Sequence, residues 1–142
     1  MSDELNKNTA MKNIKILSIV LITLFLYSCS STIKLPVSTV VPAADISATQ
    51  KEDKNGNIKI GLKVEHLASP ERLNPPKNTY VLWVYTSKVG NINIGQLSVK
   101  NGKTLTFETI VPYKVSEIFI TAEDEGNITY PSGVEISRVA FK

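Results

Sequence analysis

The sequence contains little of the chemistry that active sites and metal centres use. Its 142 residues include one cysteine, one histidine and one tryptophan. One cysteine cannot form an intramolecular disulfide, and one histidine leaves too few ligands for a zinc site. No glycine-rich phosphate loop, catalytic dyad or cofactor motif occurs in the chain. The composition therefore predicts a protein that is not an enzyme and that holds no cofactor and no metal.

An excess of charge of one sign is also missing. The formal net charge is +3, and the basic residues are scattered along the chain without a basic run. Domains that bind nucleic acid gather Lys and Arg on one patch, so we expect no nucleic-acid partner. The length allows one domain in addition to the N-terminal segment.

The one long uncharged apolar run lies near the N-terminus, at residues 16–27, after Lys12 and Lys15. Its length is typical of the apolar core of a signal peptide and is short for a membrane-spanning helix. The run ends in Leu26-Tyr27-Ser28-Cys29, which resembles a bacterial lipobox. The small Ser28 lets a peptidase reach the bond before Cys29, and the Cys29 thiol can take a lipid.

These features predict a lipid-anchored protein of the cell envelope. We expect residues 1–28 to be a lipoprotein signal peptide that is cleaved between Ser28 and Cys29, with lipidation of Cys29. Met11 is a second candidate for the start, because the basic segment after it is a sufficient signal-peptide N-terminus. Ser30, and no aspartate, follows Cys29, which favours the outer membrane, with the domain facing the periplasm. The alternative is a short membrane anchor or an ordinary signal peptide with a chance cysteine.

The residues after Cys29 contain Ser, Thr and Pro, so residues 29–42 are expected to be a lipidated tether and residues 43–142 the folded domain. A second interpretation of this segment is an edge strand that includes Val37, Val40 and Val41 and is interrupted by Pro36 and Pro42.

The most apolar stretch of the folded part is YVLWVY at residues 80–85. It does not alternate, which predicts a central strand buried on both faces. Residues 58–66 alternate strictly, which predicts a strand with one face in the core. Asn55-Gly56 and Asn101-Gly102 predict hairpin turns, and Gly95 marks a β-bulge.

About seven short strands recur at intervals of roughly ten residues, with turn residues between them and no convincing helix. This pattern predicts an all-β fold, an immunoglobulin-like antiparallel β-sandwich. Residues 68–78 hold Pro70, Pro75 and Pro76 and are expected to be a stiff connection between the two sheets.

Several motifs of the folded part resemble the extracytoplasmic C-terminal domain of the anti-sigma-K factor family. They are Tyr80-x-Leu82-Trp83-Val84, Ile94-Gly95-Gln96-Leu97, residues 118–123 (IFITAE), Gly126 and Pro131-Ser132-Gly133, and they span roughly residues 44–142. The resemblance implies a small β-sandwich. It does not imply sigma-factor binding, because that family binds its sigma factor through a separate cytoplasmic domain, for which the residues before the apolar run leave no room.

A few residues allow a functional interpretation as well as a structural one. His66 lies at the inward phase of its strand, and we expect it at the edge of the core. Trp83 could stack on a sugar, but its apolar strand favours a core position. Glu123-Asp124-Glu125 lacks the spaced oxygen ligands of a calcium loop, so a solvated turn is expected.

Three hypotheses remain for function. We expect a non-catalytic module that binds another envelope protein through a sheet edge or through the 68–78 loop. The alternative is a domain that binds a carbohydrate or small ligand, which requires exposed aromatic residues such as Tyr113 and Tyr130 along one surface. An enzyme is the least favoured of the three.

Overall fold

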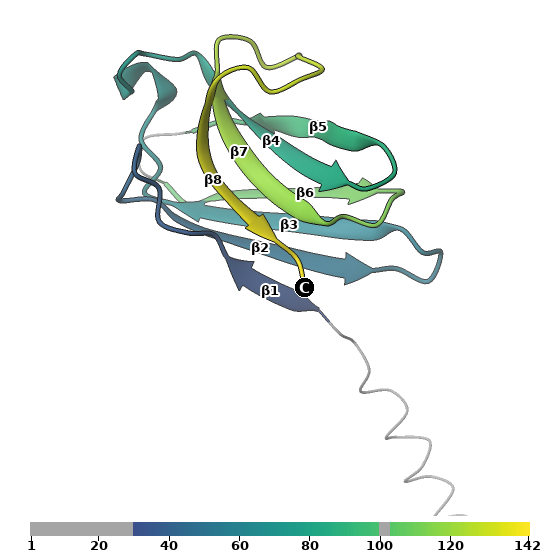
Figure 1. Ribbon diagram of the computed structural model, residues 1–142. Helices are drawn as coiled ribbons and strands as arrows, with labels where there is room; N and C mark the ends of the chain where they lie inside the picture. The colour runs from purple at the N-terminus through teal and green to yellow at the C-terminus, as the bar shows by residue number, and fades with distance from the viewer. Residues whose placement is uncertain (1–29, 100–102) are drawn as a thin grey trace, which may run out of the picture.

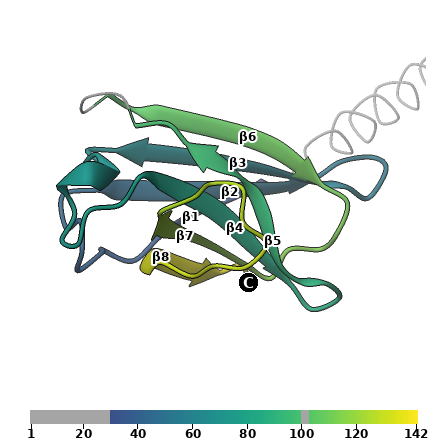
Figure 2. The ribbon, with the colours of Figure 1, turned by 90° about the horizontal axis from the view of Figure 1, so that it is seen from above.

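The computed structural model describes residues 30–99 and 103–142, and in this part the protein is an all-β sandwich of two antiparallel sheets. The strand orders are β1-β2-β3-β6 and β5-β4-β7-β8. Figures 1 and 2 show that the strands of one sheet cross those of the other at an angle. The predicted all-β sandwich is confirmed, and residues 30–99 and 103–142 contain eight strands instead of about seven.

The strands are short and evenly distributed along the chain. Their bounds are β1 Ser31–Lys34, β2 Asp45–Glu52, β3 Ile58–Glu65, β4 Thr79–Thr86, β5 Gly90–Leu97, β6 Leu105–Val111, β7 Glu117–Glu123 and β8 Val134–Ala140. The only other regular element in the described residues is a short 3-10 helix, η2, at Pro70–Arg72. No helix in this part of the chain is long and apolar enough to cross a membrane.

The sheet β1-β2-β3-β6 follows the alternation of the sequence. In β3 the isoleucine, leucine and valine side chains at every second position are buried, while Lys59 and Lys63 face outward. The β2–β3 hairpin turns at Gly56, whose φ of 80° is open to glycine at no steric cost. The predicted Asn-Gly hairpin is therefore confirmed here.

The strand β4 is the centre of the second sheet. It pairs with β5 on one side and with β7 on the other, and Tyr80 to Val84 are fully buried. A strand with neighbours on both edges and packed residues on both faces needs apolar side chains at consecutive positions. The central position predicted for residues 80–85 is confirmed.

The strand β5 contains the bulge that Gly95 predicts. Leu82 of β4 lies opposite Gly95 and Trp83 lies opposite Asn93, which leaves Ile94 as the additional residue. A Cβ atom at Gly95 would lie 2.7 Å from the Phe107 ring of β6. Glycine at this position therefore lets the two sheets approach each other at β5 and β6.

The hairpin predicted at Asn101-Gly102 requires the strands on either side of it to pair with each other, and this pairing is wrong. The strands before and after it do not pair, because β5 pairs with β4 and β6 pairs with β3. The connection passes from one sheet to the other, as does the connection from β3 to β4. Asn101 and Gly102 themselves lie outside the described residues.

The expected tether at residues 29–42 and the domain start at residue 43 also need correction. β1 begins at Ser31 and pairs along its length with β2. After it, Leu35 is buried and its N–H donates to the Ile46 carbonyl at 2.9 Å. Ser137 of β8 donates to the Pro36 carbonyl at 2.7 Å, so residues 35–44 lie against the side between β1 and β8. The segment belongs to the sandwich because its apolar residues fill this side of the core.

Candidate functional site

The predicted lipidation and cleavage residues, Ser28 and Cys29, lie outside the described residues, as does Met11. Lipidation therefore stays a prediction from the sequence. The other candidate residues lie in the described part, and the structure places them in different regions of the sandwich.

His66 is exposed, so the expected position at the edge of the core is wrong. β3 ends at Glu65, and His66 has a φ of 55°. This left-handed conformation turns the chain out of the strand, and the alternation no longer applies. The side chain points to solvent as a result.

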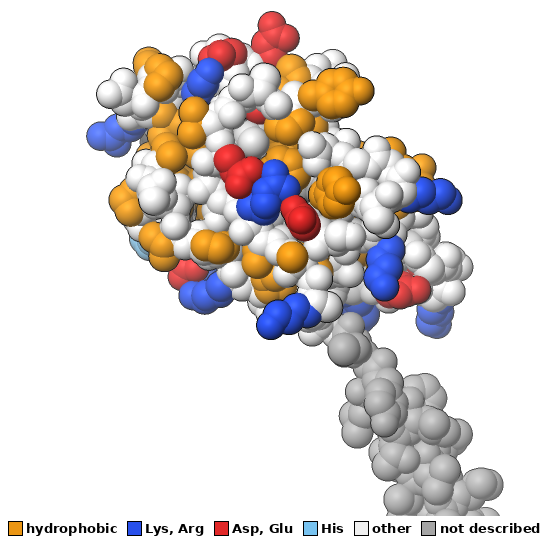
Figure 3. All heavy atoms as spheres, in the orientation of Figure 1, with side chains coloured by type: hydrophobic (Ala, Val, Ile, Leu, Met, Phe, Trp, Pro, Cys, Tyr) orange, Lys and Arg blue, Asp and Glu red, His pale blue; other side chains and the backbone are white. Residues whose placement is uncertain are grey.

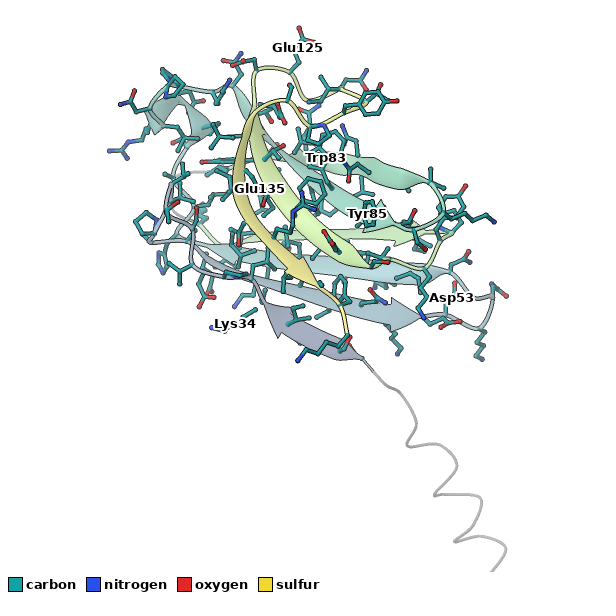
Figure 4. The ribbon with its side chains drawn as sticks, viewed as in Figure 1. Lys34, Asp53, Trp83, Tyr85, Glu125 and Glu135 are labelled. Carbon is teal, nitrogen blue, oxygen red and sulfur yellow. The ribbon has the colours of Figure 1, made fainter. Side chains whose placement is uncertain are left out.

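Trp83 is fully buried, as expected, but on the outer face of its sheet and outside the core between the sheets. Its ring stacks on Phe119 of β7, with the ring centroids 6.1 Å apart. Its indole N–H donates to the Thr121 hydroxyl at 2.8 Å, and Ile128 of the β7–β8 loop packs on the cluster. With no exposed ring face, Trp83 is unable to stack on a sugar in this conformation. Figure 4 shows Trp83 on this outer face, with Tyr85 of the same strand nearer the turn to β5.

A charged side chain, that of Arg138, packs against this outer cluster. The Arg138 guanidinium carbon lies 3.7 Å from the centroid of the Phe119 ring. Its nitrogens contact the carboxylates of Glu117 at 2.7 Å and Glu135 at 2.8 Å. Hydrogen bonding to Glu135 raises the pKa of Arg138 above its usual value, with Glu117 adding to it. The arginine is fixed by aromatic and ionic contacts, which indicates a structural role.

Glu123 departs from the expected solvated turn, while Asp124 and Glu125 are exposed as expected. Glu123 is 1% exposed and accepts hydrogen bonds from the Thr121 hydroxyl at 2.6 Å and from the Ser132 N–H at 3.1 Å. The Ser132 hydroxyl donates to its second oxygen at 3.0 Å. The sequence gives no sign of this network, because its partner Ser132 comes from across the β7–β8 loop. Among the described residues no group of three His, Cys, Asp or Glu side chains is placed to hold a metal ion.

Tyr113 and Tyr130 do not line one surface. Tyr113 lies before β7 and is partly buried against the core, whereas Tyr130 lies after β7 and is 76% exposed. A seven-residue strand separates the two loops by about 20 Å. The arrangement required for an aromatic carbohydrate site is therefore not formed by these two tyrosines.

The 68–78 loop is held on the sandwich by hydrogen bonds. The Tyr80 hydroxyl donates to the Ala68 carbonyl at 2.9 Å, and Lys77 pairs with Asp124 at 2.7 Å. The Asn78 side chain donates to the Asp124 carbonyl at 2.9 Å. Glu71 and Arg72 remain exposed on this fixed loop. The loop is therefore a rigid surface that a partner could contact with little loss of conformational entropy.

The free edge of β5 is the feature best suited to bind a ligand. In the described residues β5 pairs with β4 alone, and every second residue of such an edge turns its N–H and C=O away from the sheet. The bulge at Gly95 lies in the middle of this edge. An edge of this kind can accept a further strand.

A hollow lies on each face of β5 near its C-terminal half. The first, of about 370 Å³, lies between β5 and β6 and is lined by Gln96, Leu97, Ser98 and residues 103–107. The second, of about 350 Å³, lies under the β7–β8 loop and is lined by residues 93–96 and 126–128. Asn93 donates to the Gly126 and Ile128 carbonyls at 3.0 Å and so fixes this loop beside the strand.

The two hollows differ in character and share Gln96. Leu97, Leu105 and Phe107 give the first an apolar wall, while amide and backbone groups predominate in the second. Side chains of an added strand alternate between the two faces of the sheet, so successive residues would enter different hollows. The sequence indicated the bulge but not the hollows, because β6 and the β7–β8 loop meet β5 only in the fold.

Comparison with known proteins gave no match for this chain, whether to a protein-family model, to a curated protein or to a solved structure.

Proposed function

We propose that this protein is a lipid-anchored protein of the cell envelope whose sandwich binds an extended segment of another envelope protein, without catalysis. The anchor is a lipid on Cys29, after cleavage at Ser28, and it holds the domain at the outer membrane on the periplasmic side. The support is the apolar run at residues 16–27 and the lipobox-like LYSC that ends it.

The observation that carries the binding proposal is the free β5 edge with a hollow on each face. Main-chain hydrogen bonds along the edge supply affinity, and the hollows supply selectivity for alternate side chains. The apolar walls of the first hollow fit an aliphatic or aromatic side chain, and the amides of the second fit a polar one. A protein segment satisfies these requirements together, since it has both a backbone to pair and alternating side chains.

The resemblance to the extracytoplasmic domain of the anti-sigma-K factor family agrees with this proposal. That domain stands on the outer side of a membrane, and this chain resembles it from about residue 44 onward. The proposal includes no sigma-factor binding, because the resemblance does not extend to a cytoplasmic domain.

The anchor is tested by Cys29→Ser. Cells that express the natural chain should incorporate radioactive palmitate into it and yield the mature mass that begins at Cys29. The variant should incorporate none and keep its signal peptide. Labelling and processing of the variant at the natural size would contradict lipidation at Cys29.

The binding site is tested by photocrosslinking in intact envelopes. A photoreactive residue in place of the exposed Gln96 on β5 should give a discrete protein adduct. The same group at the exposed Thr32 on the β1 edge is the matched control, and it should give none. A group at Glu71 tests whether the partner also contacts the 68–78 loop.

A second variant shows whether the hollows take part. Ser98→Trp fills the hollow between β5 and β6, so the Gln96 adduct should fall several-fold while the fold is kept. Equal adducts at Gln96 and Thr32 would contradict the β5 site. Tight binding of a purified sugar, with no protein adduct, would favour the carbohydrate alternative instead.

A further inference from the structure

The pairing of β1 defines one end of the sandwich. Ser31, its first residue, lies opposite Gln50, so the last residues of β2 and the β2–β3 hairpin are at this end. Ile58, the first residue of β3, lies opposite Val111, the last residue of β6. The strands of this sheet therefore bring the 51–57 hairpin and the end of β6 to the place where β1 begins.

Hydrogen bonds join the second sheet to the same end. The Ser116 N–H, in the β6–β7 connection, donates to the Tyr85 carbonyl near the end of β4 at 2.8 Å. The Phe141 N–H donates to the Ser116 carbonyl at 2.9 Å, which places the residues after β8 there. We call residues 51–57, 87–89, 112–116 and 141–142 together the proximal end. In Figure 1 it is the right-hand side, where β1 begins and where the β2–β3 and β4–β5 hairpins turn.

The proximal end is rich in exposed lysines. They are Lys51, Lys54, Lys88, Lys114 and Lys142. None of them forms an ion pair with a residue that the structure describes. The acidic side chains at this end are Glu52 and Asp53, and Asp53 accepts the N–H groups of Asn55 and Asn57 at 2.8 and 2.9 Å. In Figure 3 blue side chains gather at the lower right of the visible face.

The opposite end shows no such excess in its described connections. Its basic residues Arg72, Lys77 and Lys103 are matched by Glu71, Asp124 and Glu125. Figure 4 places Glu125 at the top of the molecule and Asp53 at the right. The difference between the two ends gives the domain a positive end and a nearly neutral one.

Two apolar side chains are exposed at or beside the proximal end. Val89 is 53% exposed in the turn between β4 and β5, directly after Lys88. Ile110 near the end of β6 is 62% exposed. Aliphatic side chains among lysines suit the boundary between lipid head groups and acyl chains, because lysine keeps its charge at the phosphates while apolar groups leave water.

The short distance between the proposed anchor and β1 indicates that the membrane is what this end contacts. Cys29 precedes Ser31 by two residues, and two residues of extended chain span at most about 7 Å. The start of β1 is therefore held within about one Debye length, about 8–10 Å at physiological salt, of the lipid head groups, and the end of the sandwich that contains it is the end brought nearest to lipid phosphates.

We propose that the proximal end is a membrane-docking surface that lies on anionic phospholipid of the bilayer that carries the anchor. The proposal rests on lipidation of Cys29 and adds an orientation of the domain. The β5 edge would then rise from the membrane at Gly90, and the hollows beside its C-terminal half would lie away from the bilayer.

The test uses the processed, lipidated protein reconstituted into vesicles that contain phosphatidylglycerol. Because the thioether occupies the sulfur of Cys29, a new cysteine is the only reactive thiol. Val89→Cys carries a fluorescent label at the proximal end, and Tyr130→Cys, at the 76% exposed residue of the opposite end, is the matched control. A nitroxide lipid should quench the label at 89 several-fold more than the label at 130.

Charge reversal then tests the contribution of the lysines. Lys54→Glu/Lys114→Glu should reduce quenching at 89 several-fold, as should high salt or vesicles of phosphatidylcholine alone. Arg72→Glu/Lys103→Glu makes the same charge change at the opposite end and should leave it unchanged.

The outcomes separate the two proposals. Equal quenching at 89 and 130 in a palmitate-labelled protein overturns docking and leaves the anchor in place. Equal effects of the two double variants also overturn it. If the natural chain carries no lipid and stays in the aqueous fraction, both the docking and the anchor on Cys29 are overturned.

Discussion

Trp83 is buried by contacts that lie outside the core between the sheets. Phe119 covers one ring face, Ile128 adds a contact from the β7–β8 loop, and Thr121 accepts the indole N–H. The outer face of an antiparallel sheet is commonly solvated, so one loop turns this part of the outer face into a second, small core. The most apolar strand can therefore keep large residues at consecutive positions.

Trp83→Ala should lower the free energy of unfolding by about 3–5 kcal/mol, the usual cost of truncating a buried large aromatic residue. Trp83→Phe retains the stack on Phe119 and loses the hydrogen bond, so its loss should be smaller. Urea denaturation followed by circular dichroism measures both. The natural protein should emit blue-shifted fluorescence protected from quenchers, whereas emission like that of free tryptophan would contradict the burial.

Tyr80 faces the core between the sheets, and its hydroxyl donates to the Ala68 carbonyl. Burial raises the pKa of Tyr80 to about 12, and the negative charge of Glu71 adds to the shift. The folded protein therefore holds this proton more tightly than the unfolded chain, for which the value is 10.0. The contribution to stability is complete below pH 10 and is lost as the pH rises toward 12.

An absorbance titration should consequently show an ionisation step near pH 12 that belongs to Tyr80. Tyr80→Phe should remove this last step and flatten the fall in stability above pH 10. Tyr130→Phe, at a residue 76% exposed, is the control and should leave this last step in place. Ionisation of every tyrosine near pH 10 in the folded protein would contradict the prediction.

At the scale of elements, Glu123 connects the end of β7 to the loop that covers Trp83. Its carboxylate accepts bonds from Thr121 within β7 and from Ser132 just before β8. Gly133 makes this closeness possible, since a Cβ atom there would collide with the Ala122 carbonyl oxygen. The loop is thus closed by one buried acid and one glycine.

Glu123→Ala should destabilise the domain by about 1.5–3 kcal/mol, the typical contribution of hydrogen bonds to a charged group. It should also expose Trp83 to quenchers, because the loop loses its attachment. Glu125→Ala, two residues on and exposed, should change stability by no more than about 0.5 kcal/mol. Equal effects of the two substitutions in urea denaturation would show that the buried network is not required.

Residues 29–42 were expected to form a tether, and the structure makes β1 and the residues after it part of the domain. Leu35→Ala should therefore cost about 2–5 kcal/mol of stability, as for other buried leucines. Val37→Ala, at a residue 76% exposed in the same segment, should have little effect. If thermal unfolding of both variants matched the natural protein, the segment would act as a tether after all.

At the scale of the whole molecule, the two ends and the two sides of the sandwich are not equivalent. Residues 35–44 lie against the β1–β8 side, whereas the β5–β6 side carries free edges and a hollow. The proximal end has exposed lysines that form no ion pair with a described residue. The proposed anchor and the proposed binding edge then occupy different parts of one rigid domain, so a partner on β5 need not compete with the membrane.

Much of the architecture could be predicted from local patterns. Strict alternation in residues 58–65 predicted the half-buried strand, and the apolar run at 80–85 predicted the central strand. Gly95 predicted the bulge. Pairing partners were harder to predict, because an Asn-Gly turn at 101–102 is compatible with a hairpin and with a crossing between sheets. Whether the chain forms a hairpin or crosses between the sheets depends on which arrangement buries Leu105 and Phe107. This burial depends on the packing of both sheets.

The sequence alone determined the class of fold, the anchor prediction and the scarcity of catalytic groups, since each follows from residue types at short spacing. The tertiary structure alone decided that Glu123 is buried, that His66 is exposed and that residues 31–41 belong to the domain. It also placed hollows on both faces of β5 and lysines of distant loops at one end. These features depend on contacts between residues far apart in the chain, which local spacing does not specify.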